Sequence, residues 1–199
     1  MESLNIFIRS IFIDNMVFAF FFGMCSYIAV SKSVKTALGL GLAVTFVMVM
    51  TVPLNYLWYE YVRKAEVLVP GVDLSFLTFI VFIATIAAFV QRVGMAVEKF
   101  SPTLYNQLGI FLPLIPTNGA VLGAAKTNIS NSYSFIGSLV YGVAAGVGYT
   151  LAIVLFASIR ERLDATSKCP KCFEGFPISL VAAALLAMSF MGFSGLSIW

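Results

Sequence analysis

Histidine is missing from this chain of 199 residues, which excludes haem and zinc sites built on imidazole ligands. Charge is scarce as well, because only 11% of the residues are Asp, Glu, Lys or Arg while 60% are hydrophobic. The mean hydropathy of +0.98 lies beyond that of ordinary soluble domains. We therefore predict an all-α integral membrane protein that leaves almost no part of the chain for a soluble domain.

The small net charge of +3 gives no support for nucleic acid as a partner, because no basic face or aromatic platform accompanies it. The partner that the composition predicts is the lipid bilayer. We expect no cleavable signal peptide, since the first apolar run continues far beyond the short apolar core of a signal and lacks a basic leader.

Six apolar segments approach the length of about 20 residues that a helix needs to cross a bilayer. They are Ile6–Val30, Thr36–Tyr59, Leu74–Gln91, Leu104–Ala125, Tyr133–Ile159 and Phe176–Ile198. We predict six transmembrane helices that form a single transmembrane domain over residues 1–199.

The fourth of these segments cannot be one continuous helix. Its core, Leu108–Lys126, contains Pro113, Pro116, Gly119 and Gly123. A prolyl ring removes a backbone donor and clashes with the preceding helical turn, so the middle of the segment should unwind. Irregular backbone at membrane depth must be buried in protein or line a cavity, and such broken helices often hold the functional site.

A weaker echo of this segment occurs near the N-terminus. When GMCSYIAV is set over TNGAVLGA, Cys25 pairs with Gly119, and each short apolar stretch ends near a lysine. The segments that follow are both rich in small residues, which let helices approach closely. We interpret the chain as two three-helix repeats, about 1–100 and about 101–199, each with its first helix broken near the midplane. In the first repeat we expect the break at Gly23, Met24 and Cys25. Chance similarity between two apolar, glycine-containing stretches is the alternative.

Basic residues are distributed unequally between the two sets of loops. The loops after the first, third and fifth predicted helices carry Lys32, Lys35, Arg92, Lys99, Arg160, Arg162, Lys168 and Lys171, whereas the N-terminus and the other connections carry Arg9, Arg63, Lys64 and Lys126. The positive-inside tendency then places the first set in the cytoplasm and both termini outside, in the periplasm. With three helices per repeat, the second repeat must be inverted relative to the first.

Four residues are candidates for chemistry on their own merits. Asp14 is either a solvated interfacial group or part of an ion path. Cys25, near the bilayer centre, is by itself more typical of a small buried hydrophobe than of a ligand. Cys169 and Cys172 form a CxxC pair, which is either a redox dithiol, half of a metal site or two ordinary loop residues.

Seven motifs carry a family resemblance over nearly the whole chain. In order they are SIFIDNMVFAFFFGMC, VSKSVKT, GVDLSF, LYNQLGIFLPLI, SLVYG, IRER and FMGFSGL. With them the chain resembles the family of E subunits of the sodium-translocating NADH:quinone reductases. The sister family of Rnf-complex A subunits would fit SPTLYNQLGIFLPLI and RERL as well, whereas GVDLSF and IFIDNM favour the quinone reductase.

The resemblance implies a specific assembly in the bacterial inner membrane. The D and E subunits would be homologous six-helix proteins that pair and share a 2Fe-2S cluster, held near the midplane by two half-helix cysteines from each. The cluster would pass electrons from a cytoplasmic FAD protein towards the FMN carried by the C subunit, coupled to sodium export and reduction of ubiquinone. The A, B and F subunits would complete the complex. Cys25 matches the first family cysteine, so the resemblance makes it an iron-sulfur ligand.

Two positions depart from the family pattern. Gly119 stands where the family has its second cysteine, and Gly94 stands where the family has a glutamate near the end of the third helix. Glycine supplies neither a ligand nor a charge. A cluster with one thiolate missing would need another ligand, lose stability or be absent.

The leading hypothesis is therefore an electron-carrying membrane subunit of an NADH:ubiquinone reductase that transports sodium, without independent enzymatic activity. The first alternative is the A subunit of an Rnf complex, an ion-translocating ferredoxin:NAD oxidoreductase. The second, from a different class, is a cluster-free scaffold or small transporter whose broken helices bind an ion directly.

Overall fold

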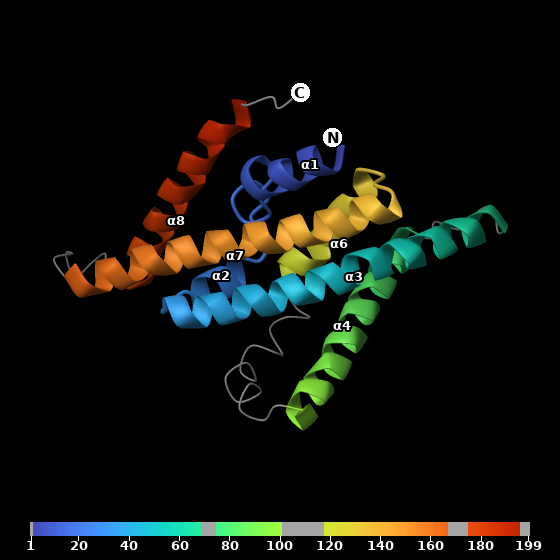
Figure 1. Cartoon of the computed structure of the whole chain (residues 1–199), viewed down its shortest axis with the longest axis horizontal. Coiled ribbons are helices and arrows are strands. Elements are labelled where there is room, and N and C mark those ends of the chain that lie inside the picture. Colours follow the sequence, from blue (N-terminus) through green and yellow to red (C-terminus); the bar gives the residue numbers. More distant parts are fainter. Residues whose placement is uncertain (1, 69–74, 101–117, 167–174, 196–199) are drawn as a thin grey trace.

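The computed structural model describes residues 2–68, 75–100, 118–166 and 175–195 (Figure 1). The elements in these ranges are α1 (Glu2–Ile8), the π-helix η1 (Arg9–Ile13), α2 (Met24–Val30), α3 (Val34–Leu68), α4 (Ser75–Phe100), α6 (Gly119–Ser130), α7 (Phe135–Thr166), α8 (Phe176–Met191) and the short 3₁₀ turn η3 (Gly192–Gly195). All of them are helical and no strand occurs in the described ranges, in agreement with the predicted fold class.

The first predicted span is broken, but not where the sequence placed the break. The helix ends at Ile13, residues 14–23 are irregular, and α2 resumes at Met24. The predicted break at Gly23, Met24 and Cys25 is therefore wrong by position, because Met24 and Cys25 already belong to the first turn of α2. Glycine at position 23 ends the irregular segment, since its φ of +77° lies in the left-handed region that favours glycine.

Helices α3 and α7 contain the two stretches of the described chain that are long and apolar enough to cross a membrane, Val34–Tyr61 and Phe135–Thr166. Both helices run beyond their predicted ends, to Leu68 and Thr166, because the apolar pattern marks the lipid-facing part and not the end of the helix. Backbone hydrogen bonds continue into polar residues that are themselves good helix formers.

The other predicted spans agree with the structure in part. Helix α8 begins at Phe176 as predicted and ends at Met191, while α4 continues to Phe100 beyond its predicted end. Most of the fourth span, including Pro113 and Pro116, lies at positions 101–117, outside the described residues. The count of six spans and their repeat relationship stay predictions.

The centre of the fold is the antiparallel pair α3 and α7, which lie side by side in Figure 1. A Cβ at Gly41 would lie 2.6 Å from Thr150 Cγ2, and one at Gly146 would lie 2.8 Å from Thr45 Cα. Residue numbers therefore rise along one helix as they fall along the other. The small residues allow the backbones to approach closely, which is the packing mode expected in a membrane.

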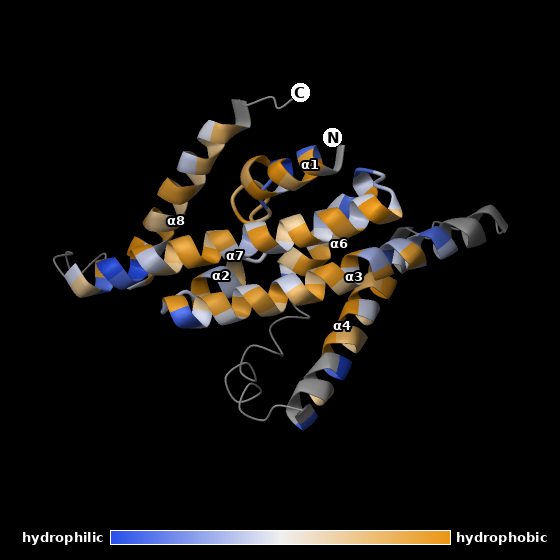
Figure 2. Cartoon of the chain, viewed as in Figure 1, coloured by the Kyte–Doolittle hydropathy of each residue, from blue (hydrophilic) through white to orange (hydrophobic). Residues whose placement is uncertain are grey.

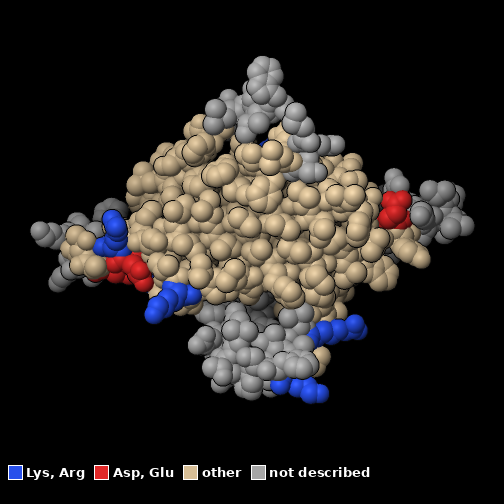
Figure 3. All heavy atoms as spheres, in the orientation of Figure 1, with Lys and Arg blue, Asp and Glu red and all other residues tan. Residues whose placement is uncertain are grey.

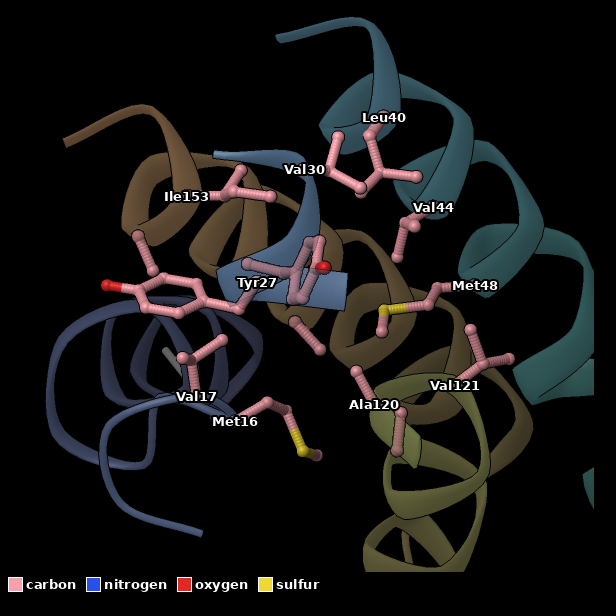
Figure 4. Close-up of a cluster of buried hydrophobic side chains, with 14 of the residues drawn as sticks. Met16, Val17, Tyr27, Val30, Leu40, Val44, Met48, Ala120, Val121 and Ile153 are labelled. Carbon is pink, nitrogen blue, oxygen red and sulfur yellow. The ribbon is translucent and has the colours of Figure 1, made fainter. Parts of the chain in front are cut away.

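Short helices α2 and α6 complete the core against this pair. Figure 4 shows Tyr27 of α2 and Val121 of α6 among side chains such as Met48 of α3 and Ile153 of α7. The Tyr27 ring stacks on Phe156 with 4.5 Å between centroids and 12° between planes. Close packing of this kind fixes the directions in which α2 and α6 point.

The outer surface is apolar in its middle and charged at its edges. Figure 2 shows hydrophobic residues along most of α3 and α7 with hydrophilic residues near their ends, and Figure 3 shows charged side chains at the periphery of that view. Leu42, Ile136 and Leu185 are 61%, 70% and 57% exposed. An exterior of this kind is suited to lipid contact and not to water.

Candidate functional site at the meeting of two helix starts

The N-terminal ends of α2 and α6 meet inside the fold. A Cβ at Gly119, the first residue of α6, would lie 3.5 Å from the backbone nitrogen of Gly23, the residue that precedes α2. A Cβ at Gly23 would lie 2.7 Å from Asn118 Oδ1 and 2.9 Å from Ala120 Cβ. The two segments that the sequence had aligned, around Cys25 and Gly119, are thus neighbours in space.

Cys25 lies one residue inside α2, and its side chain is exposed and free. The expectation from composition alone, a cysteine buried as a small hydrophobe, is wrong. The burial of Ser26 and Tyr27, the two residues that follow Cys25, explains the difference, because these neighbours occupy the inward face of the helix. The thiol therefore faces outward, away from the core.

Gly119 is half-buried, and the space where a side chain would start is open. The contact of 3.5 Å to the nitrogen of Gly23 is an ordinary van der Waals distance. The backbone of Gly119 is helical, because α6 begins at this residue with Asn118 as its N-cap. A cysteine at position 119 is therefore compatible with the fold, although the chain has none there.

Hydrogen bonds hold the two helix starts in place. The Asn118 side chain accepts a hydrogen bond from the Ala120 amide at 3.1 Å and so caps α6. The Ser26 hydroxyl donates to the Gly23 carbonyl at 3.0 Å, so the Tyr149 hydroxyl, 2.8 Å from Ser26 Oγ, acts as donor to it. Tyr149 thereby ties the start of α2 to α7.

Asn15 organises the irregular segment that leads to the site. Its side-chain amide donates to the carbonyls of Ile11 at 2.9 Å and Gly148 at 3.0 Å, and its Oδ1 accepts from the Val17 amide at 3.0 Å. The bonds to Ile11 and Val17 satisfy backbone groups beside the break, and the bond to Gly148 ties this segment to α7. The sequence reasoning missed Asn15 and Tyr149, although a polar residue within an apolar run is itself a signal.

A second anchor lies at the opposite end of α2. One guanidinium nitrogen of Arg160, in α7, donates hydrogen bonds to the Ile28 carbonyl at 2.8 Å and to Ser31 Oγ at 2.9 Å. A cation beside the last carbonyls of a helix both caps it and complements its dipole. The IRER motif, which the sequence analysis gives only as part of the family resemblance, therefore holds the C-terminal end of α2 in place.

Asp14 forms an ion pair with Arg9, with 2.7 Å between Nε and Oδ2 and with both side chains more than one-third exposed. Of the two predicted roles for Asp14, this arrangement favours the interfacial one. Gly94 lies within α4, and its surroundings are not described. Cys169 and Cys172 lie outside the described residues.

An iron-sulfur cluster of the expected kind requires four ligands, and thiolates are the usual ones. Within the described ranges, no three His, Cys, Asp or Glu side chains come together to hold a metal ion, and Cys25 stands alone beside Gly119. The described residues therefore offer one thiol at this point and do not complete such a cluster by themselves.

Comparison with known proteins finds relatives over nearly the whole chain. Residues 3–197 match a family described as "Rnf-Nqr subunit, membrane protein". The chain is 52% identical over 195 residues to the E subunit of the Na(+)-translocating NADH-quinone reductase of Aeromonas salmonicida, with 98% of each chain covered. It is 50% identical to the protein of that name from Proteus mirabilis and 51% identical to that from Aeromonas hydrophila, with the same coverage.

Proposed function

The chain belongs to the Rnf-Nqr family of membrane subunits, and on that premise we propose that it is the E subunit of a sodium-translocating NADH-quinone reductase. Identity of about half over almost the full length of both chains supports the quinone reductase, not the Rnf complex, as its assembly. The chain would act as part of an oxidoreductase complex and have no catalytic residues of its own.

The observation that carries the proposal is the meeting of the two helix starts. Two short helices that begin at the same point inside a membrane protein are typical of broken-helix sites in transporters. The exposed Cys25 lies on one of them, directed away from the core. This arrangement supports a redox site completed by a second protein of the complex.

We further propose the finer architecture that the sequence predicted. The order of a short helix, a long helix and a further helix occurs twice, as α2, α3 and α4 and as α6, α7 and α8. The antiparallel crossing of α3 and α7 supports two repeats of opposite orientation. The complex would reside in the bacterial inner membrane with the termini of this chain in the periplasm.

The proposed cofactor contact is Cys25 as one ligand of an iron-sulfur cluster shared with the homologous D subunit. Such a cluster supplies one-electron chemistry. Gly119 provides no ligand, so a complete site would need three ligands from outside the described part of this chain. The role of this chain would then be to position one sulfur and to exclude water around it.

The test measures iron and acid-labile sulfide in the complex purified through a tag on this chain, with low-temperature EPR. The variants are Cys25→Ser, Gly119→Cys and, as a control for an added thiol, Gly39→Cys, a position with no atom within 4 Å of a new Cβ. We expect iron to depend on Cys25, to rise with Gly119→Cys and to stay unchanged with Gly39→Cys.

The opposite pattern would refute parts of the proposal separately. Iron that persists in Cys25→Ser rules out Cys25 as a ligand. Failure of the tagged chain to co-purify with other NADH-quinone reductase subunits rules out the assignment to that complex.

A further inference from the structure

A two-part hollow lies beside η1 and the irregular segment at 14–23. A polar cavity of about 370 Å³ lies between η1 and the turn that joins α6 to α7. An apolar cavity of about 560 Å³ lies between the irregular segment at 14–23 and α8. Asp14 and Phe20 line both cavities, so the two are adjacent parts of one amphipathic hollow.

The polar part carries a net positive charge. Its ionisable lining residues are Arg9, Lys126 and Asp14, which gives two positive charges and one negative charge and therefore a net charge of +1. Arg9 uses Nε for its ion pair with Asp14, which leaves the other guanidinium N–H groups available. Hydroxyl groups of Thr127 and other residues add neutral donors around the two cations. A single phosphate diester anion matches this set in charge and in hydrogen-bonding type.

The apolar part has the character of a hydrocarbon site. Its walls are aromatic side chains of the irregular segment and small or flexible side chains of α8, among them Phe21, Ala184 and Met188. Phe21 is 61% exposed and Met188 is 59% exposed. An exposed apolar groove that shares Asp14 and Phe20 with a cationic pocket matches a molecule with a charged head and a long hydrocarbon chain.

The depth of the pocket agrees with a lipid headgroup. Lys126 follows Gly119 by seven helical positions, which corresponds to about 10 Å along the axis at 1.5 Å per residue. If the helix starts lie near the midplane, the hydrocarbon core extends about 15 Å on that side. A lysine side chain bridges the remaining distance to the interface.

We propose that this hollow binds one anionic phospholipid of single net charge, with its phosphate between Arg9 and Lys126 and an acyl chain along α8. Phosphatidylglycerol has the required chemistry. The lipid belongs to the leaflet at the end of α7 opposite Arg160, because Lys126 and the α6–α7 turn lie at the other end of that helix. The Arg9 side chain is 62% exposed, so the two cations alone give a free phosphate little enclosure.

The bound lipid has a structural consequence for the helix-start site. Phe21 adopts a φ of +57°, a conformation that is strained for a bulky residue. This residue lies two positions before Gly23, whose left-handed backbone introduces α2. An acyl chain packed on Phe21 would cover its exposed ring and stabilise the turn that sets the direction of α2.

The experiment measures binding of acyl-chain-labelled phosphatidylglycerol to the tagged full chain with its co-purifying subunits in mild detergent. Unlabelled phosphatidylglycerol, phosphatidylcholine, glycerol 3-phosphate and inorganic phosphate serve as competitors. Lys126→Gln tests the head site and Arg162→Gln, an exposed cation at the far end of α7, is its control. Ala184→Trp tests the groove, and Leu185→Trp is its control because Leu185 lines a different cavity on α8.

We expect saturable binding that only unlabelled phosphatidylglycerol displaces efficiently. Lys126→Gln should weaken binding about five-fold, in keeping with roughly 1 kcal/mol per basic residue near a lipid surface. Ala184→Trp should weaken it at least as much, and both controls should leave it unchanged.

Three results would overturn the proposal. Equal binding by the test variants and their controls would show that the hollow is not the site. Competition by glycerol 3-phosphate or inorganic phosphate at the same concentration would show an anion site without a lipid groove. Equal displacement by phosphatidylcholine would show that charge plays no part.

Discussion

Replacement of Gly146 by alanine should loosen the α3–α7 crossing. The new Cβ would lie 2.8 Å from Thr45 Cα and 2.8 Å from Thr45 Cγ2. Comfortable carbon–carbon contacts are about 3.5–4.0 Å, so the helices must separate locally by about 1 Å. Backbone atoms cannot rotate away as a side-chain tip can, and therefore the cost falls on the packing of both helices.

The expected loss can be estimated from opposing terms. Overpacking of a tight interface costs about 1–3 kcal/mol. The separation also strains the hydrogen bond between the Thr45 and Thr150 hydroxyls, 2.9 Å apart, and such interhelical bonds contribute about 0.6 kcal/mol in membranes. Alanine regains up to about 1 kcal/mol in helix propensity. The net effect should be a destabilisation of about 1–2 kcal/mol.

The measurement is the free energy of unfolding from SDS titration in mixed micelles, followed by circular dichroism. Gly39→Ala is the matched control, because it gains the same propensity on α3 with no atom within 4 Å of its new Cβ, so it should be neutral or stabilising. If Gly146→Ala proved as stable as Gly39→Ala, the helices would not cross as closely as described and the reasoning would fail.

Two further substitutions test the anchors of α2. Tyr149→Phe should cost about 1 kcal/mol of unfolding free energy by removing its hydrogen bond to Ser26. Tyr27→Phe should be neutral or stabilising, since the buried Tyr27 hydroxyl has no partner. Equal losses of the two variants in SDS titration would contradict this. Arg160→Gln should lower the free energy of unfolding by about 1–3 kcal/mol, because it removes the cap of α2. Arg162→Gln, at an exposed position of the same helix, should lower it by less than about 0.5 kcal/mol. Equal thermal stability of the two variants in detergent would argue against the cap.

The helical class, the approximate positions of the long helices and the close approach of α3 and α7 were predictable from composition. Apolar run length indicates where a chain enters lipid, and glycine content indicates where backbones approach. The helix ends were less predictable, since α7 continues to Thr166 through residues whose charge says nothing about helix termination. A weak internal similarity in the sequence aligned Cys25 with Gly119 as equivalent positions of two repeats, and the structure brings the starts of their helices together.

The contacts that hold the site were not predictable from the pattern. Asn15 bonds to the carbonyl of Gly148, which is 133 positions away, and Tyr149 bonds to Ser26 across 123 positions. Periodicity describes one helix at a time and contains no information about partners at such separation. The outward direction of Cys25 was unpredictable for the same reason, because it depends on which face of the seven-residue helix α2 packs against the core.

The structural setting of Gly119 leaves room for the thiol that the family resemblance implies at this position. A Cβ at Gly119 would have one neighbour within 4 Å, the backbone nitrogen of Gly23 at 3.5 Å, so no other part of the fold occupies this space. The capping bond of Asn118 to the Ala120 amide is intact, and α6 begins in register with that cap. Gly23, by contrast, cannot accept a side chain, because a Cβ would approach Asn118 Oδ1 to 2.7 Å on a backbone of positive φ. Of the two glycines where the helix starts meet, position 23 is therefore required by the fold, whereas position 119 is free to carry a thiol without disturbing the helices that surround it.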